Sequence, residues 1–293
     1  MTDNNCTTVT KFIILGLTAD PNFRVILFVT FLGVYGVTLV GNLTTITLTR
    51  NSSQLHTPMY LFLSHLAFVD IGYSSSVTPV MLKNFLVDKT VIPVAGCVAQ
   101  MFFAATFGAA ECFLLAVMAY DRYVAICSPL LYSTKMSPRV STLLLISSYL
   151  GGCVIACIFT GCLWNLSFCG PNKINNFFCD YSPLLKLSYS QVCLAEILPA
   201  ASGGSMIVIT VFIIIISYVY ILFSVLKISS IEGRSKAFST CTSHLTAVTL
   251  FYSTTTFYVM PKSSYSTEIN EVVCFLHCNN PHVEPHDLQS KEQ

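Results

Sequence analysis

Five potential metal ligands lie close together near the end of the sequence. The segment CFLHCNNPHVEPHDLQSKEQ has the spacing Cys-x2-His-Cys-x3-His-x3-His. Cysteine thiolates and histidine imidazoles at such spacings are the usual ligands of structural zinc. Zinc binding is therefore one interpretation of this polar tail. The ligands would be Cys274, His277, Cys278, His282 and His286.

Two carboxylates interrupt long apolar runs. Asp70 and Glu111 each stand alone within more than twenty mostly apolar residues. An isolated ionised carboxylate is costly in such surroundings, so each is either protonated or shares a cation and water. The alternative is that each only hydrogen-bonds to a neighbouring helix. The sequence does not make them a catalytic pair.

The composition identifies the medium in which these groups must be placed. The 293 residues are 54% hydrophobic and only 10% charged, and the net charge is +1. Soluble domains contain roughly a quarter charged residues, so this chain belongs in a membrane. Nucleic-acid binding is excluded, because it needs clustered Lys and Arg. The sequence contains no HExxH, GxSxG or Gly-rich phosphate motif, and we do not expect an enzyme.

Six runs are long enough for membrane helices, which need about 20 apolar residues. They cover residues 25–49, 59–82, 91–119, 141–161, 197–226 and 237–260. The start of the third run contains Pro93 and is expected to be a loop. We therefore predict an all-α integral membrane protein with three parts. These are an extracellular segment at residues 1–24, a six-helix bundle at residues 25–260 and an atypical polar tail at residues 261–293.

The connections between the runs suggest an orientation in the membrane. Lys and Arg are equally numerous on the two sides, so the positive-inside rule alone does not decide. Cysteines in the connections gather on one side, and disulfides persist outside the cell. Asn5 lies in the sequon Asn5-Cys6-Thr7 on that same side and could carry a glycan. We expect a multi-pass plasma-membrane protein with an extracellular N-terminus.

Several ordered motifs resemble one receptor family. MAYDRYVAICSPLLY, residues 118–132, closes the third run with Asp121-Arg122-Tyr123. This string is similar to the signature of rhodopsin-like G-protein-coupled receptors, and specifically of their odorant receptor branch. The resemblance covers about residues 10–268, and four more segments agree with it. They are Gly41-Asn42, His56-Thr57-Pro58-Met59-Tyr60, Ser217-Tyr218 and KAFSTCTSHL at residues 236–245.

The resemblance implies a rhodopsin-like helical bundle that binds small volatile odorants. On binding, it would activate a stimulatory, olfactory-type heterotrimeric G protein. In the family, the arginine matching Arg122 is held by its neighbouring aspartate at rest and receives the G protein after the sixth helix moves. From sequence alone, Arg122 could instead extend to water or pair with Asp121. The implied switch residues are Asp121, Arg122, Tyr123, Tyr218, Lys236 and His244.

The resemblance also implies two ligand sites. Asp70 and Glu111 match the acidic positions of an allosteric sodium site, the only metal implied. The odorant pocket lies among the third, fifth and sixth helices, although residues at these positions could equally be ordinary helix packing. The candidate pocket residues are Ala104, Gly108, Cys112, Ser202, Met206, Tyr252, Thr255 and Val259.

Outside the membrane, the family pattern implies a disulfide between Cys97 and Cys179. A second bridge departs from that pattern, because Tyr189 replaces a cysteine of the segment LSYSQVC. Cys169 pairs with Cys193 or remains free.

The family also requires a seventh helix, beginning near Glu271, where this chain has the polar tail. Residues 277–293 can be encoded so that a shift of one base gives TVIIPMLNPMIYSLRN, which resembles that helix. We therefore expect a change of reading frame close to Val273, and no zinc site. Such a product should fold poorly, because helix faces that normally pack on the seventh span are left without it.

Two other functional classes remain open at this point. A six-span transporter or channel would also place carboxylates in the membrane, but the sequence has no internal repeat or selectivity filter. A receptor fragment that associates with intact receptors without signalling is the other alternative.

Overall fold

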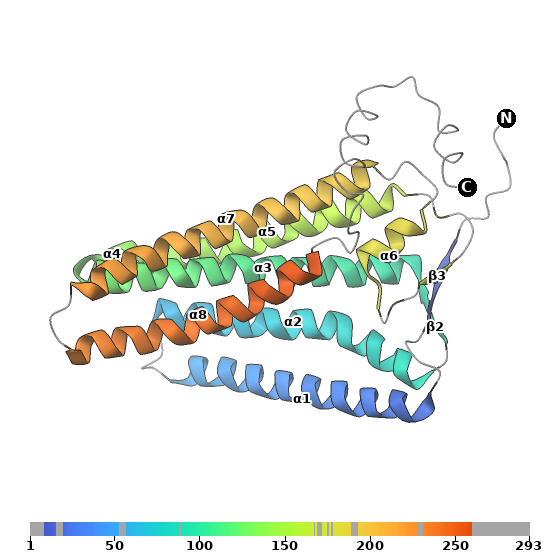
Figure 1. The fold of residues 1–293 in the computed structure, drawn as a ribbon, viewed down its shortest axis with the longest axis horizontal. Helices are drawn as coiled ribbons and strands as arrows, with labels where there is room; N and C mark the ends of the chain where they lie inside the picture. Colours follow the sequence, from blue (N-terminus) through green and yellow to red (C-terminus); the bar gives the residue numbers. More distant parts are fainter. Residues whose placement is uncertain are drawn as a thin grey trace, which may run out of the picture.

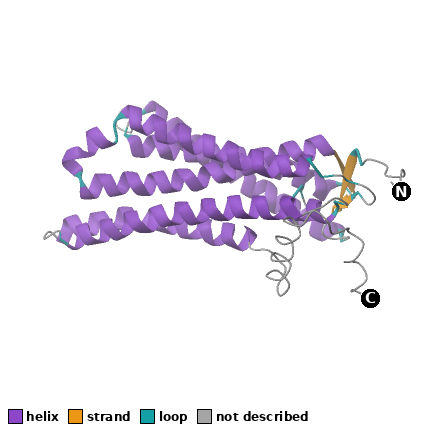
Figure 2. Ribbon diagram, turned by 90° about the horizontal axis from the view of Figure 1, so that it is seen from above, coloured by secondary structure: helices purple, strands orange, loops and turns teal. Residues whose placement is uncertain are grey.

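Most of the chain is organised as long helices. The computed structural model describes residues 9–15, 20–52, 57–87, 89–166, 168, 172–174, 176, 178–188, 193–227 and 231–259. The long helices are α1 (Pro21–Asn51), α2 (Pro58–Leu86), α3 (Val94–Cys127), α5 (Pro138–Trp164), α7 (Cys193–Leu226) and α8 (Ile231–Val259). Figures 1 and 2 show them side by side along the long axis of the molecule.

A long helix lies at each of the six predicted runs. Four of them are long and apolar enough to cross a membrane, namely Pro21–Asn51, Val94–Cys127, Pro138–Trp164 and Ala195–Leu226. Five of these helices begin before their apolar runs, whereas α3 begins at Val94, inside its run, because β2 precedes it. Proline and polar residues begin several of the helices. Asp20 accepts a hydrogen bond from the Asn22 amide at 3.0 Å, and Pro21 occupies the first turn. Proline suits this position because its missing N–H would have no partner there.

Helix α3 is the centre of the bundle. It packs against α2, α5, α7 and α8, whereas α1 packs mainly against α2. Gly152 of α5 makes close approach possible, since a Cβ at this position would lie 2.5 Å from the Thr106 carbonyl oxygen of α3. Large apolar side chains such as Val37 of α1 remain exposed. Such exposed faces suit lipid contact, and small residues at helix contacts are typical of membrane bundles.

A small sheet lies at one end of the bundle and was not predicted. Strand β1 (Lys11–Leu15) is central, between β2 (Lys89–Pro93) and β3 (Lys173–Ile174). Ile13 pairs antiparallel with Val91. The segment before α3 was expected to be a loop, but it forms β2 instead. Phe12 and Ile14 are almost fully buried, so this sheet has a hydrophobic core of its own.

Three short helical segments complete the part of the chain that the structure describes. They are η2 (Pro129–Leu131) and α4 (Tyr132–Lys135) at the end opposite the sheet, and α6 (Tyr181–Lys186) near the sheet. The tail from residue 260 onward, including the five potential zinc ligands, lies outside the described residues.

Candidate functional site

The Asp121-Arg122-Tyr123 motif lies in the last two turns of α3. Asp121 is 2% exposed, and the Tyr132 hydroxyl donates a hydrogen bond to its carboxylate at 2.9 Å. Burial and the neighbouring carboxylate both raise the pKa of Tyr132, so this phenol stays protonated and remains a donor. The motif therefore has a partner in α4 that the sequence analysis missed.

A second hydrogen bond joins α7 to α8 at the same end. The Tyr218 hydroxyl lies 2.7 Å from Nδ1 of His244, and the two rings stack with centroids 5.9 Å apart. Arg122 is close enough to act electrostatically on both side chains. The structure therefore brings Asp121, Arg122, Tyr218 and His244 to one region.

Two further members of the predicted switch can be placed. Tyr123 packs with Tyr218 against a small cluster formed by Ile221, Val225 and Cys241. Lys236 lies within α8, but its side chain is not among the parts that the structure describes.

Asp70 and Glu111 lie near each other between α2 and α3. The two carboxylates interact electrostatically, and the Asn42 side chain of α1 hydrogen-bonds to Asp70. Oxygen atoms of this kind are the ligands that hard cations prefer. The described residues contain no group of three or more His, Cys, Asp or Glu side chains that could hold a metal ion. A cation here would therefore need amide or hydroxyl oxygens besides the two carboxylates.

Three of the predicted pocket residues come together between α3, α7 and α8. Cys112, Met206 and Tyr252 belong to one buried cluster. The Tyr252 hydroxyl donates to the backbone oxygen of Cys112 at 3.2 Å. This contact fixes a phenol between α3 and α8, and the buried Thr210 side chain of α7 also hydrogen-bonds to it.

The other predicted pocket residues have different surroundings. Gly108 faces Tyr73 of α2, since a Cβ there would lie 3.6 Å from that ring. The Ser202 hydroxyl donates to the Pro199 carbonyl of its own helix at 3.1 Å. Ala104 and Thr255 are partly buried, and the side chain of Val259 lies outside the described part of the chain.

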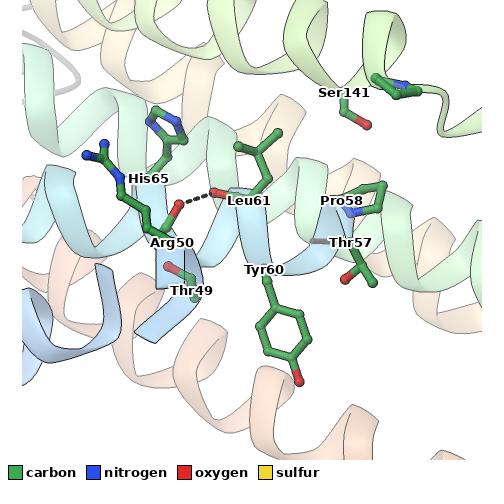
Figure 3. A pocket seen from close by; sticks show the side chains of 10 residues that line it. Thr49, Arg50, Thr57, Pro58, Tyr60, Leu61, His65 and Ser141 are labelled. Carbon is green, nitrogen blue, oxygen red and sulfur yellow. Dashed lines mark hydrogen bonds between the residues drawn. The ribbon is translucent and has the colours of Figure 1, made fainter. Parts of the chain in front are cut away.

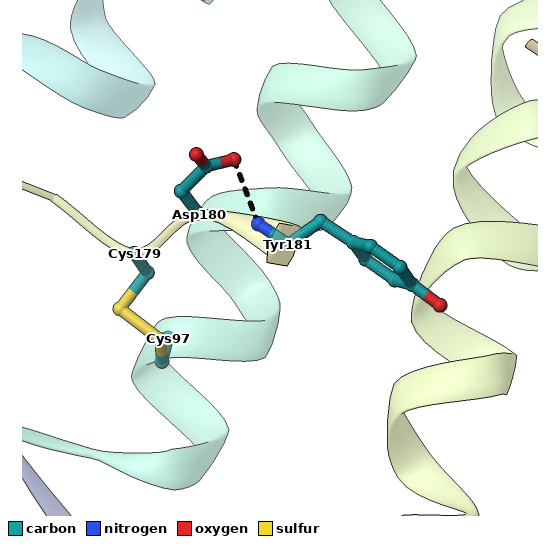
Figure 4. Close-up of a disulfide and its surroundings, with 4 residues drawn as sticks. All are labelled: Cys97, Cys179, Asp180 and Tyr181. Atoms are coloured by element: carbon teal, nitrogen blue, oxygen red, sulfur yellow. Dashed lines mark hydrogen bonds between the residues drawn. A yellow bond between two sulfur atoms is a disulfide. The ribbon is translucent and has the colours of Figure 1, made fainter. Parts of the chain in front are cut away.

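The predicted disulfide between Cys97 and Cys179 is confirmed. It joins the first turn of α3 to the segment before α6, with a Cα–Cα distance of 5.5 Å. Figure 4 shows Asp180 and Tyr181 following directly, where Asp180 accepts a hydrogen bond from the Tyr181 amide at 2.7 Å. The Tyr181 hydroxyl in turn donates to the Ala195 carbonyl of α7. Burial is the main cause that raises the pKa of Tyr181, so its phenol remains protonated and keeps this contact.

The remaining extracellular predictions are not tested by the structure. Asn5 and Cys169 lie outside the described residues, and only the helical backbone of Cys193 is described.

Comparison with known proteins identifies the family. A family model described as olfactory receptor matches residues 31–282. Olfactory receptor 5p57 and Olfactory receptor 5P80, both from Mus musculus, are 70% and 68% identical to the chain. Olfactory receptor 5P3 from Homo sapiens is 67% identical. Each alignment covers 274 residues, which is 93% of this chain and 88% of the relative.

This chain belongs to the olfactory receptor family. It is therefore a multi-pass membrane receptor of the G-protein-coupled type and not an enzyme. The comparisons do not favour a transporter or channel. Odorant receptor function, inferred first from the motifs, agrees with both the family model and the relatives.

Proposed function

We propose that this olfactory receptor binds a small volatile odorant among α3, α7 and α8 and activates a stimulatory G protein at the other end of the bundle. The observation that carries this proposal is the 67–70% identity to olfactory receptors over 93% of the chain. Coupling between the two ends requires only that the odorant binds the active arrangement better than the resting one.

The proposed odorant site is mainly apolar and contains few hydroxyl groups. The packing of Cys112, Met206 and Tyr252 supports a site at this level of the bundle. We also assign to it the flanking positions Ala104, Gly108, Ser202, Thr255 and Val259. A weakly polar ligand fits such a lining, because apolar contact supplies affinity and one or two polar groups fix its orientation.

The proposed G-protein site contains Arg122, Tyr218 and His244. Because Tyr218 and His244 are hydrogen-bonded across α7 and α8, movement of α8 would break this bond and change the surroundings of Arg122. Asp121, Tyr123 and Lys236 complete the proposed switch.

The disulfide supports the orientation that we propose. A bond between Cys97 and Cys179 favours an oxidising compartment for the end that carries the sheet. We therefore place the N-terminus outside the cell, with Asn5 as a glycosylation site and Cys169–Cys193 as a second bridge.

A sodium ion between Asp70 and Glu111 would stabilise the resting receptor. The two carboxylates and the Asn42 side chain supply hard oxygen ligands, so the residues fit such an ion. The cation would supply charge compensation between α2 and α3.

The polar tail replaces a seventh helix in this proposal. We base the change of reading frame near Val273 on the polar residues that follow it in the sequence and on the helix-like string that a shift of one base produces. The bundle would then have six spans, with the tail on the extracellular side.

The test compares the chain with a version whose frame is restored after Val273. Both would be expressed in cells, and surface labelling and odorant-evoked cyclic nucleotide would be measured. We expect the restored version to reach the surface and to signal, and Arg122→Gln in that version to abolish signalling without loss of surface labelling. If the chain signals equally well as it stands, the frame diagnosis is wrong. If neither version responds to any odorant in a broad panel despite surface labelling, the odorant function is wrong.

A further inference from the structure

A cavity opens at the end of the bundle opposite the disulfide. It lies between the last turn of α1 and the first turns of α2 and α5, and its volume is about 370 Å³. This value falls within the roughly 300–1,000 Å³ of typical ligand pockets. Figure 3 shows Arg50 and His65 at one side of the cavity, Pro58 at the other and Ser141 above.

Two helix N-termini meet at this cavity. Pro58 is the first residue of α2 and Pro138 the first residue of α5, and both line it. Neither helix has a side-chain hydrogen bond at its N-cap or an acidic residue in its first turn. The N-terminus of a long helix carries unpaired N–H groups and a partial positive charge, so it attracts anions.

The side chains around the cavity add to this positive character. Arg50 is exposed at its mouth and has no carboxylate partner among the described residues. Among the described residues that line the cavity, none is acidic and one, His65, is a histidine. The cavity therefore combines the full positive charge of Arg50 with the partial positive charges of the α2 and α5 N-termini.

Ser141 provides a second, independent indication of a ligand. Its side chain lines the cavity and is only 1% exposed, yet its hydroxyl has no hydrogen-bond partner within the described structure. Buried hydroxyl groups nearly always have a partner, and one without a partner needs an explanation. An acceptor oxygen bound in the cavity would supply it.

We infer that this cavity binds the headgroup phosphate of an anionic phospholipid from the cytoplasmic leaflet. Leu48, next in sequence to the lining residue Thr49, and Leu143, two residues after the lining residue Ser141, are 58% and 66% exposed, so acyl chains can lie against the same two helices. The cytoplasmic leaflet is the one that carries anionic lipids, and basic pockets between membrane helices bind their headgroups. Arg50 would contact the phosphate, and Ser141 would donate a hydrogen bond to it.

The experiment uses the full chain in nanodiscs of phosphatidylcholine alone or of three parts phosphatidylcholine to one part phosphatidylserine. Native mass spectrometry counts the retained lipids, and thermal unfolding gives the melting temperature. We expect phosphatidylserine to be retained and to raise the melting temperature. Arg50→Gln should weaken apparent lipid affinity roughly fivefold. The matched control is Lys135→Gln, an exposed cation at the same end that does not line the cavity. Equal effects of the two substitutions would overturn the assignment.

Ser141→Ala tests the site without removing a charge. In phosphatidylcholine alone, the variant should be as stable as the parent or more stable, because an unpaired buried hydroxyl is removed. In discs with phosphatidylserine, the rise in melting temperature should be smaller than for the parent. An unchanged rise would show that the hydroxyl is not a ligand and would contradict the proposal.

Inorganic phosphate distinguishes the source of the anion. We expect millimolar phosphate to have little effect in phosphatidylcholine discs, because it lacks acyl chains to place against α1 and α5. If it raises the melting temperature as much as phosphatidylserine and displaces that lipid, the cavity binds free phosphate instead. None of these measurements uses an odorant. The lipid site and the odorant receptor function can therefore be disproved independently of each other.

Discussion

The two ends of the bundle are held by different kinds of interaction. At the sheet end, the Cys97–Cys179 disulfide and the backbone pairing of β1 join segments far apart in sequence. At the opposite end, the bonds are between side chains, from Tyr132 to Asp121 and from Tyr218 to His244. A rotamer change can break a side-chain hydrogen bond, whereas a disulfide breaks only on reduction and a strand pair only when the two backbones separate. The first end is therefore suited to keeping its shape and the second to exchanging partners.

The largest expected effect is at the sheet end. Cys97→Ser should lower the free energy of unfolding by about 2–5 kcal/mol, because it removes a cross-link that closes a loop of more than eighty residues. Thermal unfolding of the purified receptor, followed by circular dichroism, measures the loss. Cys153→Ser is the control, since Cys153 is a free cysteine. Equal melting temperatures for the two variants would show that the disulfide does not stabilise the sheet end of the bundle.

The middle of the bundle should respond next. Gly152→Ala should destabilise the receptor by about 1–3 kcal/mol, because the new Cβ would meet the Thr106 carbonyl oxygen and force α5 away from α3. Gly161→Ala in the same helix is the control, as nothing lies within 4 Å of its Cβ position. The same unfolding assay serves here. A loss no greater than that of the control would mean that α5 and α3 can separate freely.

A smaller effect is expected where α4 meets α3. Tyr132→Phe should lower the free energy of unfolding by about 1–2 kcal/mol, because buried Asp121 loses a hydrogen-bond donor. Tyr120→Phe, which changes another tyrosine near this end, should alter it by less than about 0.5 kcal/mol. If the two variants unfold at the same temperature, the Tyr132 bond contributes nothing to the resting structure.

The smallest effect belongs to the bond between α7 and α8. Tyr218→Phe should cost about 0.5–1.5 kcal/mol of stability, the usual net contribution of one hydrogen bond. It should also raise basal cyclic-nucleotide signalling in the frame-restored receptor, because α8 is then held less firmly. Tyr220→Phe on the exposed side of α7 is the control. Unchanged basal signalling would show that this bond does not restrain α8.

The sequence predicted the positions of the long helices better than their ends. Apolar runs locate a membrane helix, but the polar residues that begin or extend it lie outside the run. Helix α3 continues to Cys127, well beyond the apolar run that ends near residue 119, because the Asp121-Arg122-Tyr123 segment remains helical. The sheet was missed because strands of five and two residues give little periodicity to read.

Contacts across the chain were predictable only where a motif supplied them. The family pattern gave the Cys97–Cys179 pair, which is confirmed. It did not give Tyr132 as the partner of Asp121, because that contact depends on the turn at η2. No sequence pattern predicted the cavity at Arg50, because its lining residues come from three helices and have no regular spacing in the sequence.

The position of β1 in the sheet has a consequence for biosynthesis. This strand is translated before both of its neighbours in the sheet, which are residues 89–93 and residues 173–174. The sheet can be completed only after α1, α2, α3 and α5 have been translated. Until then the apolar side chains of Phe12 and Ile14 have no finished core to enter, so this sheet closes late in synthesis.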